Sequence, residues 1–142
     1  MEELKNGATP AELMAAANRK NNFMIYNGMT LTQMSKERAV VSLLPNEHSL
    51  NPLGNVHGGA LFTLADCAAG ALSRAVGNGI YVTLGGNLNF VKGVSTGEIS
   101  ATATLLHGGR STIVVNVDIC NAQNALLAQG SFTFFRTGDL PG

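Results

Sequence analysis

Hydrophobic and polar residues alternate with two different periods along the chain, one typical of an α-helix and one typical of β-strands. From Gly58 to Val76 the apolar positions recur every three or four residues, which places them on one face of a helix. They are Leu61, Leu64, Ala65, Ala68, Leu72 and Ala75. The run Gly77-Asn78-Gly79 then ends the pattern. We therefore predict a long helix over 58–76, thin enough in its alanine-rich part for a sheet to wrap closely around it.

The part of the chain after residue 79 predicts strands and no further helix. The expected strands are rich in β-branched and aromatic residues and are separated by turns that contain Gly or Asn. They span residues 80–90, 98–107, 111–120 and 126–136. In the third strand, apolar residues such as Ile113 and Val115 share one face, while Thr112, Asn116 and Asp118 occupy the other. This alternation favours an antiparallel meander with one wet face, and looser alternation over 29–44 adds two short strands.

The beginning of the chain has the pattern of a helix N-terminus. Thr9, Pro10 and Glu12 fit the N-cap, N1 and N3 positions of a capping box, which predicts a short helix through about Asn18. We treat residues 1–22 as a peripheral helix and lead-in within one domain, 1–142. The predicted fold is α+β: a long central helix wrapped by a curved antiparallel sheet of five to six strands, with the N-terminal helix outside.

The composition of the chain limits the partners that it can have. Apolar residues make up 45% of the chain and charged residues 13%, so we expect it to fold and to bury further surface by oligomerising. Nine basic residues are scattered and balanced by nine acidic ones, which argues against nucleic acid or an anionic membrane as partner. The start MEELKNG differs from a signal peptide, and no apolar run is long enough to span a bilayer. These features predict a cytoplasmic protein. Cys67 and Cys120 form no metal-binding or redox motif and are expected to be small buried residues.

The start of the predicted central helix is a candidate oxyanion site. Gly58 and Gly59 lie where the first N–H groups have no partner within the helix and where the helix dipole is positive. The same glycines would also allow close packing or an unusual backbone angle at the helix entry. Taken alone, the pair favours this second, structural role.

Asp66 raises a separate question, because it lies within an otherwise apolar helix. A buried carboxylate is costly unless it is hydrogen-bonded, paired or lining a cleft. Alternatively, Asp66 lies on a solvated stripe with Thr63, Gly70 and Ser73. Asp66 follows Gly58 by eight residues, which is roughly 12 Å along a helix axis. If both groups serve one reaction, the site must be shared between two subunits related by a twofold axis.

The residues around this helix start match a known family. The string N-x-x-G-x-x-H-G-G-x-L-x-x-L-x-D, over residues 51–66, resembles the signature of hot-dog-fold acyl-CoA thioesterases of the phenylacetate-degradation (PaaI-like) type. The resemblance extends from about residue 25 to 136 and includes the strings YVTLGGNLNFVKGV, HGGRST and LLAQGSFTFF. It implies hydrolysis of a small aromatic or aliphatic acyl-CoA to the carboxylic acid and coenzyme A. It also implies a homodimer or homotetramer and no cofactor, since the coenzyme A thioester is the substrate.

The resemblance implies catalytic roles position by position. Asp66 corresponds to the carboxylate that acts as general base on water or as nucleophile on the thioester carbonyl. The Gly58 backbone N–H, from the neighbouring subunit, corresponds to the donor to the thioester oxygen. Asn51 corresponds to an amide that orients the water or the partner of the carboxylate, and His57 to a positioning or polarising group. Thr83 is expected to hydrogen-bond the water or Asp66.

The resemblance also implies substrate contacts at a second set of positions. Arg110 and Ser111 lie in the GGRST turn, which matches a region that commonly meets the coenzyme A phosphates. Gly59, Asn89 and Lys92 are further expected substrate contacts. The chain departs from the family at Lys92, because a proline usually follows this strand and none is present here. We therefore expect the loop and its coenzyme contacts to differ at this point.

Other chemistries fit the residues less well. The G-x-S-x-G string at 93–97 precedes a predicted strand, whereas the nucleophile of a serine hydrolase precedes a helix. His48, His57 and His107 lack metal-ligand spacing, so no metal site is predicted, and no nucleotide-binding motif is present. Two alternatives to a thioesterase remain: a non-catalytic hot-dog module that binds acyl-CoA, and a hydratase or dehydratase that acts on acyl thioesters.

Overall fold

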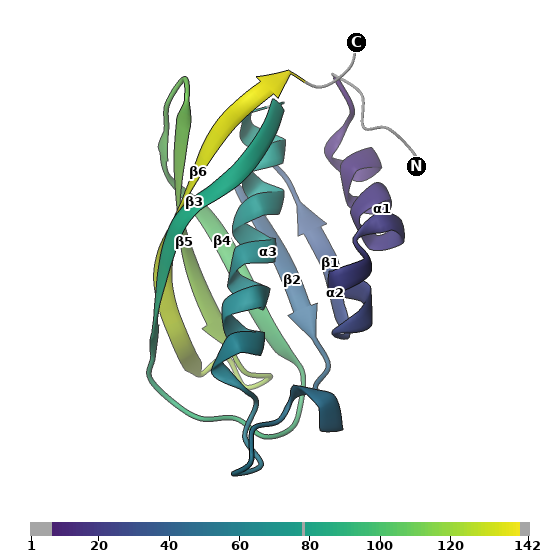
Figure 1. Cartoon of the computed structure of the whole chain (residues 1–142), viewed down its shortest axis with the longest axis vertical. Coiled ribbons are helices and arrows are strands. Elements are labelled where there is room, and N and C mark those ends of the chain that lie inside the picture. Colours follow the sequence, from purple (N-terminus) through teal and green to yellow (C-terminus); the bar gives the residue numbers. More distant parts are fainter. Residues whose placement is uncertain (1–6, 78, 140–142) are drawn as a thin grey trace.

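One long helix lies across a curved antiparallel sheet in the computed structural model, which describes residues 7–77 and 79–139 (Figure 1). The helices are α1 (Pro10–Lys20), α2 (Asn22–Tyr26) and α3 (Gly58–Gly77), with a short 3₁₀ helix at Glu47–Ser49. The strands are β1 (Met29–Met34), β2 (Arg38–Leu43), β3 (Gly79–Phe90), β4 (Ile99–Gly108), β5 (Thr112–Cys120) and β6 (Leu126–Asp139). This arrangement confirms the predicted α+β fold.

The helix α3 is buried along the predicted stripe. All six of the apolar residues predicted to face the core are buried, and the helix begins at Gly58 as expected. Ala68 and Ala69 are fully buried, and their small side chains allow the sheet to pack closely against the helix. Ser73, which the solvated-stripe alternative exposed to water, is also fully buried and donates a hydrogen bond to the Gly70 carbonyl oxygen at 2.7 Å. The solvated-stripe alternative is therefore wrong at Ser73.

The sheet has six strands in the order β1-β2-β4-β5-β6-β3, and all neighbours are antiparallel. The meander is confirmed for β4, β5 and β6, but it is wrong for β3, which pairs with β6 and not with β4. The reason is that β2 pairs with residues 99–104 of β4 and so occupies that edge of the strand. The segment after β3 crosses beneath the start of α3, where the Val56 N–H donates to the Val94 carbonyl oxygen at 2.7 Å.

As a result, β3 is a long edge strand. It has 12 residues and pairs only with β6 among the described strands. Its apolar side chains Ile80, Val82 and Leu84 are 42%, 46% and 61% exposed. A long apolar edge of this kind is a template for pairing with another strand.

The N-terminal segment forms two helices where the sequence predicted one. α1 has the expected N-cap, since the Glu12 N–H donates to Thr9 Oγ1 at 3.2 Å, and it continues two residues past Asn18. Asn21 then caps α2 by accepting from the Met24 N–H at 3.1 Å.

Asn18 fastens the two helices to the sheet. Its Nδ2 donates to the Leu31 carbonyl oxygen and its Oδ1 accepts from the Leu31 N–H, both at 2.8 Å. The amide thus takes the place of a neighbouring strand on the open edge of β1, and α1 and α2 come to lie beside α3 on that side of the molecule (Figure 1).

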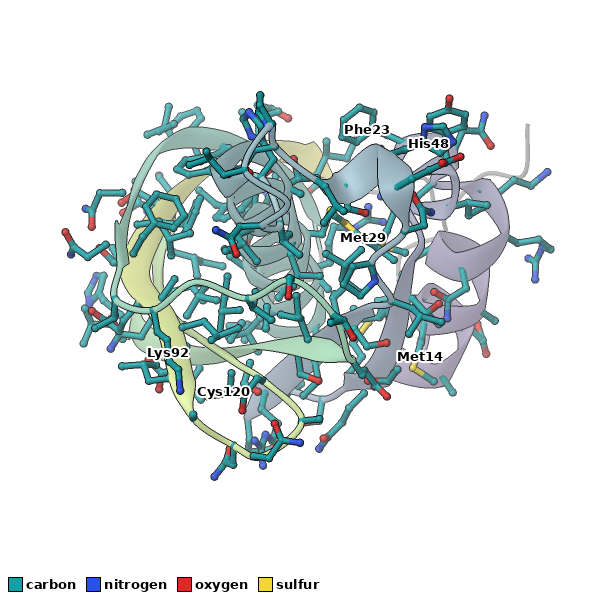
Figure 2. All side chains as sticks on the ribbon, turned by 90° about the horizontal axis from the view of Figure 1, so that it is seen from below. Met14, Phe23, Met29, His48, Lys92 and Cys120 are labelled. Atoms are coloured by element: carbon teal, nitrogen blue, oxygen red, sulfur yellow. The ribbon has the colours of Figure 1, made fainter. Side chains whose placement is uncertain are left out.

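The interior between helix and sheet is filled by side chains. Figure 2, seen from below, shows this packing, with the labelled Lys92, His48 and Phe23 on the outside. Phe62 on α3 and Phe132 on β6 pack with their ring centroids 5.0 Å apart. Within residues 7–77 and 79–139, no helix combines the length and hydropathy needed to span a membrane.

Candidate functional site

Asp66 is half-buried in the middle of α3 and is held by a neighbour on β3. Thr83 Oγ1 donates a hydrogen bond to Asp66 Oδ1 at 2.9 Å. A β-bulge at Leu84 follows directly, because Thr83 pairs with Phe134 while Gly85 pairs with Thr133. A bulge re-aims the side chains beside it. The carboxylate therefore keeps its second oxygen available while the first is anchored.

Cys67 lies next to Asp66 and is the other candidate nucleophile on this part of the helix. Burial, with the charge of Asp66 adding to it, raises the pKa of the Cys67 thiol to about 11. The thiol is therefore protonated near neutral pH, and a thiolate is what cysteine chemistry requires. This argues against Cys67 as a nucleophile and leaves Asp66 as the candidate.

The start of α3 presents one backbone donor. The Gly59 N–H donates to His57 Nδ1 at 2.8 Å, and the Ala60 and Leu61 N–H groups both donate to the His57 carbonyl oxygen. Within the part of the chain that the structure describes, the Gly58 N–H has no hydrogen-bond acceptor. The positive end of the helix is thus concentrated at a single free N–H, at Gly58.

The same contact fixes the tautomer of His57. Because Nδ1 accepts from the Gly59 N–H, a neutral imidazole carries its proton on Nε2. The side chain is exposed, so Nε2–H is available as a second donor near the helix start. The position is suited to polarising a carbonyl oxygen rather than to accepting a proton through Nδ1.

Two other predicted residues, Asn89 and Lys92, lie at this end of the molecule. A Cβ on Gly58 would lie 3.3 Å from Phe90 Cζ, so the end of β3 packs against the helix start. Asn89 precedes Phe90 on β3, and Lys92 follows it with its side chain exposed (Figure 2). Asn89 and Lys92 are thereby near the Gly58–Gly59 turn.

Asn51 organises its own loop. Its Oδ1 accepts from the Leu53 N–H at 2.9 Å and from the Asn55 N–H at 3.1 Å. This is an Asx-type turn that shapes the approach to α3. The carbonyl of the Asn51 side chain is therefore occupied, and only its NH₂ group is left for a ligand or a second subunit.

Arg110 and Ser111 lie at the opposite end of the sheet. They form the exposed turn between β4 and β5, and a Cβ on Gly108 at its base would lie 3.9 Å from Val76 Cγ1 near the end of α3. Figure 1 shows this turn and the start of α3 at opposite ends of the molecule. One chain therefore does not bring Arg110 and Ser111 to Gly58.

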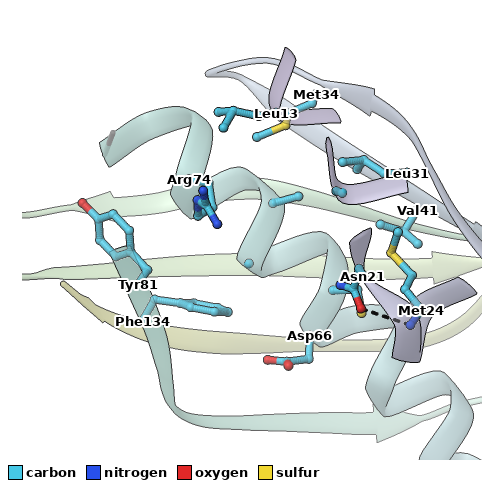
Figure 3. Close-up of a pocket in the computed structure, with 14 residues that line it drawn as sticks. Leu13, Asn21, Met24, Leu31, Met34, Val41, Asp66, Arg74, Tyr81 and Phe134 are labelled. Atoms are coloured by element: carbon cyan, nitrogen blue, oxygen red, sulfur yellow. Dashed lines mark hydrogen bonds between the residues drawn. The ribbon is translucent and has the colours of Figure 1, made fainter. Parts of the chain in front are cut away.

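Beside Asp66 lies a cavity of about 250 Å³ between α3, the N-terminal helices and the sheet (Figure 3). Its apolar lining comes from α1, α2, β1, β2 and β6, and its polar lining includes Asn21, Arg74 and Tyr81. The apolar residues are Leu13, Met24, Leu31, Met34, Val41 and Phe134, with Ala17 and Ala71 beside them.

The sequence analysis missed this cavity and its arginine. Arg74 is an isolated charge on the same apolar helix as Asp66, so the argument that singled out Asp66 also applied to it. The contribution of α1 and α2 to the lining left no signal in the sequence, because it depends on how the N-terminal segment docks.

Comparisons with known proteins identify the family of the chain. The family model of the thioesterase superfamily matches residues 53–128 of the chain. The chain is similar to the 1,4-dihydroxy-2-naphthoyl-CoA hydrolase of Listeria monocytogenes, with 33% identity over 70% of this chain and 83% of the relative. It is also similar to the acyl-coenzyme A thioesterase PaaI of Escherichia coli, with 30% identity over 71% of this chain and 72% of the relative.

Solved structures share the whole architecture. The E. coli PaaI protein from the phenylacetic acid degradation operon superposes with a TM-score of 0.84 and 27% identity, over 94% of this chain and 97% of that chain. A hypothetical thioesterase protein from Streptococcus pneumoniae, solved with coenzyme A, gives a TM-score of 0.74 and 33% identity, over 79% of this chain and 88% of that chain. The chain therefore belongs to the thioesterase superfamily, and it is a thioester hydrolase of the PaaI-like type with the hot-dog fold.

Proposed function

We propose that the chain is an acyl-CoA thioesterase in which Asp66 is the catalytic carboxylate. The observation that carries the proposal is the half-buried Asp66, anchored by Thr83 at the edge of an apolar cavity. The names of the PaaI and naphthoyl-CoA relatives, and the coenzyme A in the S. pneumoniae structure, support coenzyme A thioesters as substrates.

The reaction adds water across the thioester bond. Asp66 either takes a proton from the attacking water or attacks the carbonyl carbon itself, and the second route ends with water cleaving the resulting anhydride. The carbonyl oxygen gains negative charge, which the free Gly58 N–H and the His57 Nε2–H stabilise. The C–S bond then breaks, and the coenzyme A sulfur leaves and receives a proton. The carboxylic acid and coenzyme A are the products, and no cofactor takes part.

The site requires two subunits. Gly58 and Asp66 are separated by eight residues of α3, roughly 12 Å along its axis. The exposed edge of β3 supports a homodimer in which this strand pairs with its own copy. A twofold axis makes the paired copies antiparallel, so the Phe90 end of one strand approaches the half of the other that carries Thr83. Because Gly58 packs against Phe90 and Asp66 is bonded to Thr83, this pairing brings the two groups toward each other.

The remaining predicted residues are proposed to bind the substrate in this dimer. Asn51 offers its NH₂ group to the water or to the carboxylate of the neighbouring subunit, while Gly59, Asn89 and Lys92 contact the coenzyme near the helix start. Arg110 and Ser111 are proposed to meet coenzyme phosphates from the opposite end of the sheet, which requires a second subunit as well. A homotetramer, a single domain over 1–142 and a cytoplasmic location stay predictions.

The experiment that tests the function is release of free thiol from a panel of aromatic and aliphatic acyl-CoA thioesters. Wild type is expected to turn over part of the panel, and Asp66→Asn is expected to lower kcat by about 10²–10⁴-fold, the usual contribution of a general base. Asp118→Asn changes an exposed carboxylate on β5 and serves as the control.

Two outcomes would count against the proposal. Hydrolysis by Asp66→Asn at the wild-type rate would remove Asp66 from the mechanism. Tight binding of acyl-CoA by the wild type without any turnover would favour the non-catalytic binding module.

A further inference from the structure

Arg74 carries buried polar atoms that the described part of the chain leaves without a hydrogen-bond partner. Its Nε and Nη2 atoms are buried and have no hydrogen-bond partner among residues 7–77 and 79–139. Burial lowers the pKa of this guanidinium, and no neighbouring carboxylate in the described chain counteracts that effect. Buried guanidinium N–H groups are normally paired with an anion or another acceptor, because leaving them unpaired is costly.

The Arg74 side chain lines the same cavity as the Asp66 carboxylate. Asp66 and Arg74 both line this space from α3, as Figure 3 shows. Between them the helix contributes Gly70 and Ala71, which leave room along its surface. The two residues are eight positions apart, roughly 12 Å along the axis. Both residues line the cavity from this one helix, so a substrate that spans the distance between them contacts both.

The rest of the lining fits a chain of methylene groups. Leu13, Met24, Leu31 and Val41 surround the space between the two charges. The cavity wall therefore holds the Asp66 carboxylate and the unpaired Arg74 nitrogens among mainly apolar side chains, with Asn21 and Tyr81 as its other polar labelled residues in Figure 3. A neutral acyl tail would fill the apolar part of the cavity but leave the buried Nε and Nη2 atoms of the half-buried Arg74 side chain without a partner.

We infer that the preferred acyl group ends in a second carboxylate, so that the substrate is the mono-coenzyme A thioester of a medium-length dicarboxylic acid. This inference rests on the proposed function. The far carboxylate pairs with the Arg74 guanidinium, which can accept it with two parallel hydrogen bonds. Water adds to the thioester carbon beside Asp66, the C–S bond breaks, and the products are the free diacid and coenzyme A.

The two charges also set the length of the acyl group. A short diacid would hold its far carboxylate close to Asp66, where like charges repel, and would not reach Arg74. A hydroxyl group at the end of the acyl chain would accept a hydrogen bond without neutralising the guanidinium. Adipyl-CoA and suberyl-CoA are therefore the expected type of substrate, and succinyl-CoA is expected to be poor.

The test compares thioesters of equal chain length. The ratio of kcat/KM for adipyl-CoA to that for hexanoyl-CoA, and for suberyl-CoA to octanoyl-CoA, is measured by thiol release. Wild type is expected to favour the diacid thioester, and Arg74→Met is expected to lower the ratio about tenfold or more, as loss of a buried charge partner does. Arg74→Lys keeps the charge and is expected to restore part of the ratio. Arg38→Met, an exposed arginine at the start of β2, is the matched control and should leave the ratio unchanged.

The outcomes separate this inference from the proposed function. Hydrolysis of hexanoyl-CoA and octanoyl-CoA with no preference for the diacids, and no change of the ratio in Arg74→Met, would overturn the inference while leaving the thioesterase intact. A preference for a hydroxylated aromatic acyl group over the diacids would overturn it as well. No hydrolysis of any thioester by the wild type would mean that the proposed function has failed. If Arg74→Met does not fold, the comparison of wild type with Arg74→Lys on the same pairs decides the question.

Discussion

The hydroxyl of Thr83 donates a 2.9 Å hydrogen bond to the carboxylate of Asp66, and so joins the edge strand β3 to the middle of α3. The bond orients the carboxylate and leaves one oxygen free for chemistry. Thr83→Val keeps the shape of the side chain but removes the donor, and we expect kcat for thioester hydrolysis to fall roughly tenfold.

Thr83→Ser is the matched control, because it keeps the hydroxyl, and it should retain most of the activity. Both rates come from the thiol-release assay, with circular dichroism to verify the fold. Equal kcat values for the valine and serine variants would show that the bond plays no part in turnover.

The free N–H of Gly58 can be removed without breaking the helix. Proline is tolerated at the first position of an α-helix, so Gly58→Pro deletes the donor while α3 can still form. We expect kcat to fall by about 10²–10³-fold, as happens when one oxyanion donor is lost. Gly58→Ala adds a comparable Cβ, 3.3 Å from the exposed Phe90 ring, but keeps the N–H. If the alanine variant is as inactive as the proline variant, the loss is due to packing against Phe90 and not to the donor.

A shared site predicts complementation between inactive variants. A homodimer of Asp66→Asn, or of Gly58→Pro, carries its defect at both of its sites. The two variants complement each other only when they are combined in one dimer, if the carboxylate and the donor come from different subunits. In a mixed dimer, one site receives both defects and the other receives neither. After unfolding and refolding at equal concentrations, about a quarter of wild-type activity is expected, because half of the dimers are mixed and each has one intact site. Activity no higher than that of the separate variants would mean that each site lies within one chain.

The raised pKa of Cys67 predicts that its thiol is alkylated slowly in the folded chain. Burial shifts the pKa upward from 9.0 to about 11, so the thiolate is suppressed in the folded state and not in the unfolded one. Below pH 9, the folded chain should hold about a hundredfold less thiolate at Cys67 than the urea-unfolded chain. Alkylation by iodoacetamide at pH 8, followed by mass spectrometry of peptides, measures the two rates. Similar rates at Cys67 in the folded and unfolded chains would contradict the assignment.

The hydrogen bonds between Asn18 and Leu31 predict a loss of stability. Asn18→Ala removes two bonds to a strand edge and leaves the Leu31 backbone groups without these partners. We expect the free energy of unfolding to fall by about 1–3 kcal/mol. Urea unfolding followed by far-UV circular dichroism measures the change, and Gln123→Ala in the exposed turn before β6 is the control. A change below about 0.5 kcal/mol, the range of ordinary surface substitutions, would argue against the role given to Asn18.

Local patterns predicted most of the elements, since the stripe from Leu61 to Ala75 and the alternation in β5 depend only on spacing along the chain. The position of β3 in the sheet was not predictable in this way, because the alternation of apolar and polar residues in a strand does not indicate whether the strand pairs with β4 or with β6. α2 has five residues, too few for a helical period, and its cap at Asn21 became clear only in the structure.

The candidate site was predictable to a similar degree. If Gly58 and Asp66 serve one reaction, their spacing already predicts a site shared between two subunits, and the resemblance supplied the expected roles. The use of the Gly59 N–H by His57 Nδ1 was not foreseen, because it depends on a side-chain rotamer at the helix entry. Arg74 was passed over as one more scattered charge, since its burial depends on how α1 and α2 dock beside α3.

That docking involves the Asn18 amide and the buried side chains Leu13, Ala16 and Met24, and it has a consequence for how such a chain can evolve. The groups proposed to break the thioester belong to residues after position 50, whereas much of the wall of the acyl cavity belongs to residues before position 35. The part of the cavity wall that lies before position 35 is thus encoded apart from the groups proposed to cleave the bond, whereas Arg74 lies on the same helix as Asp66. Mutational drift before position 35 can change the accepted acid without disturbing bond cleavage, so lineages that keep the same helix can acquire different metabolic roles.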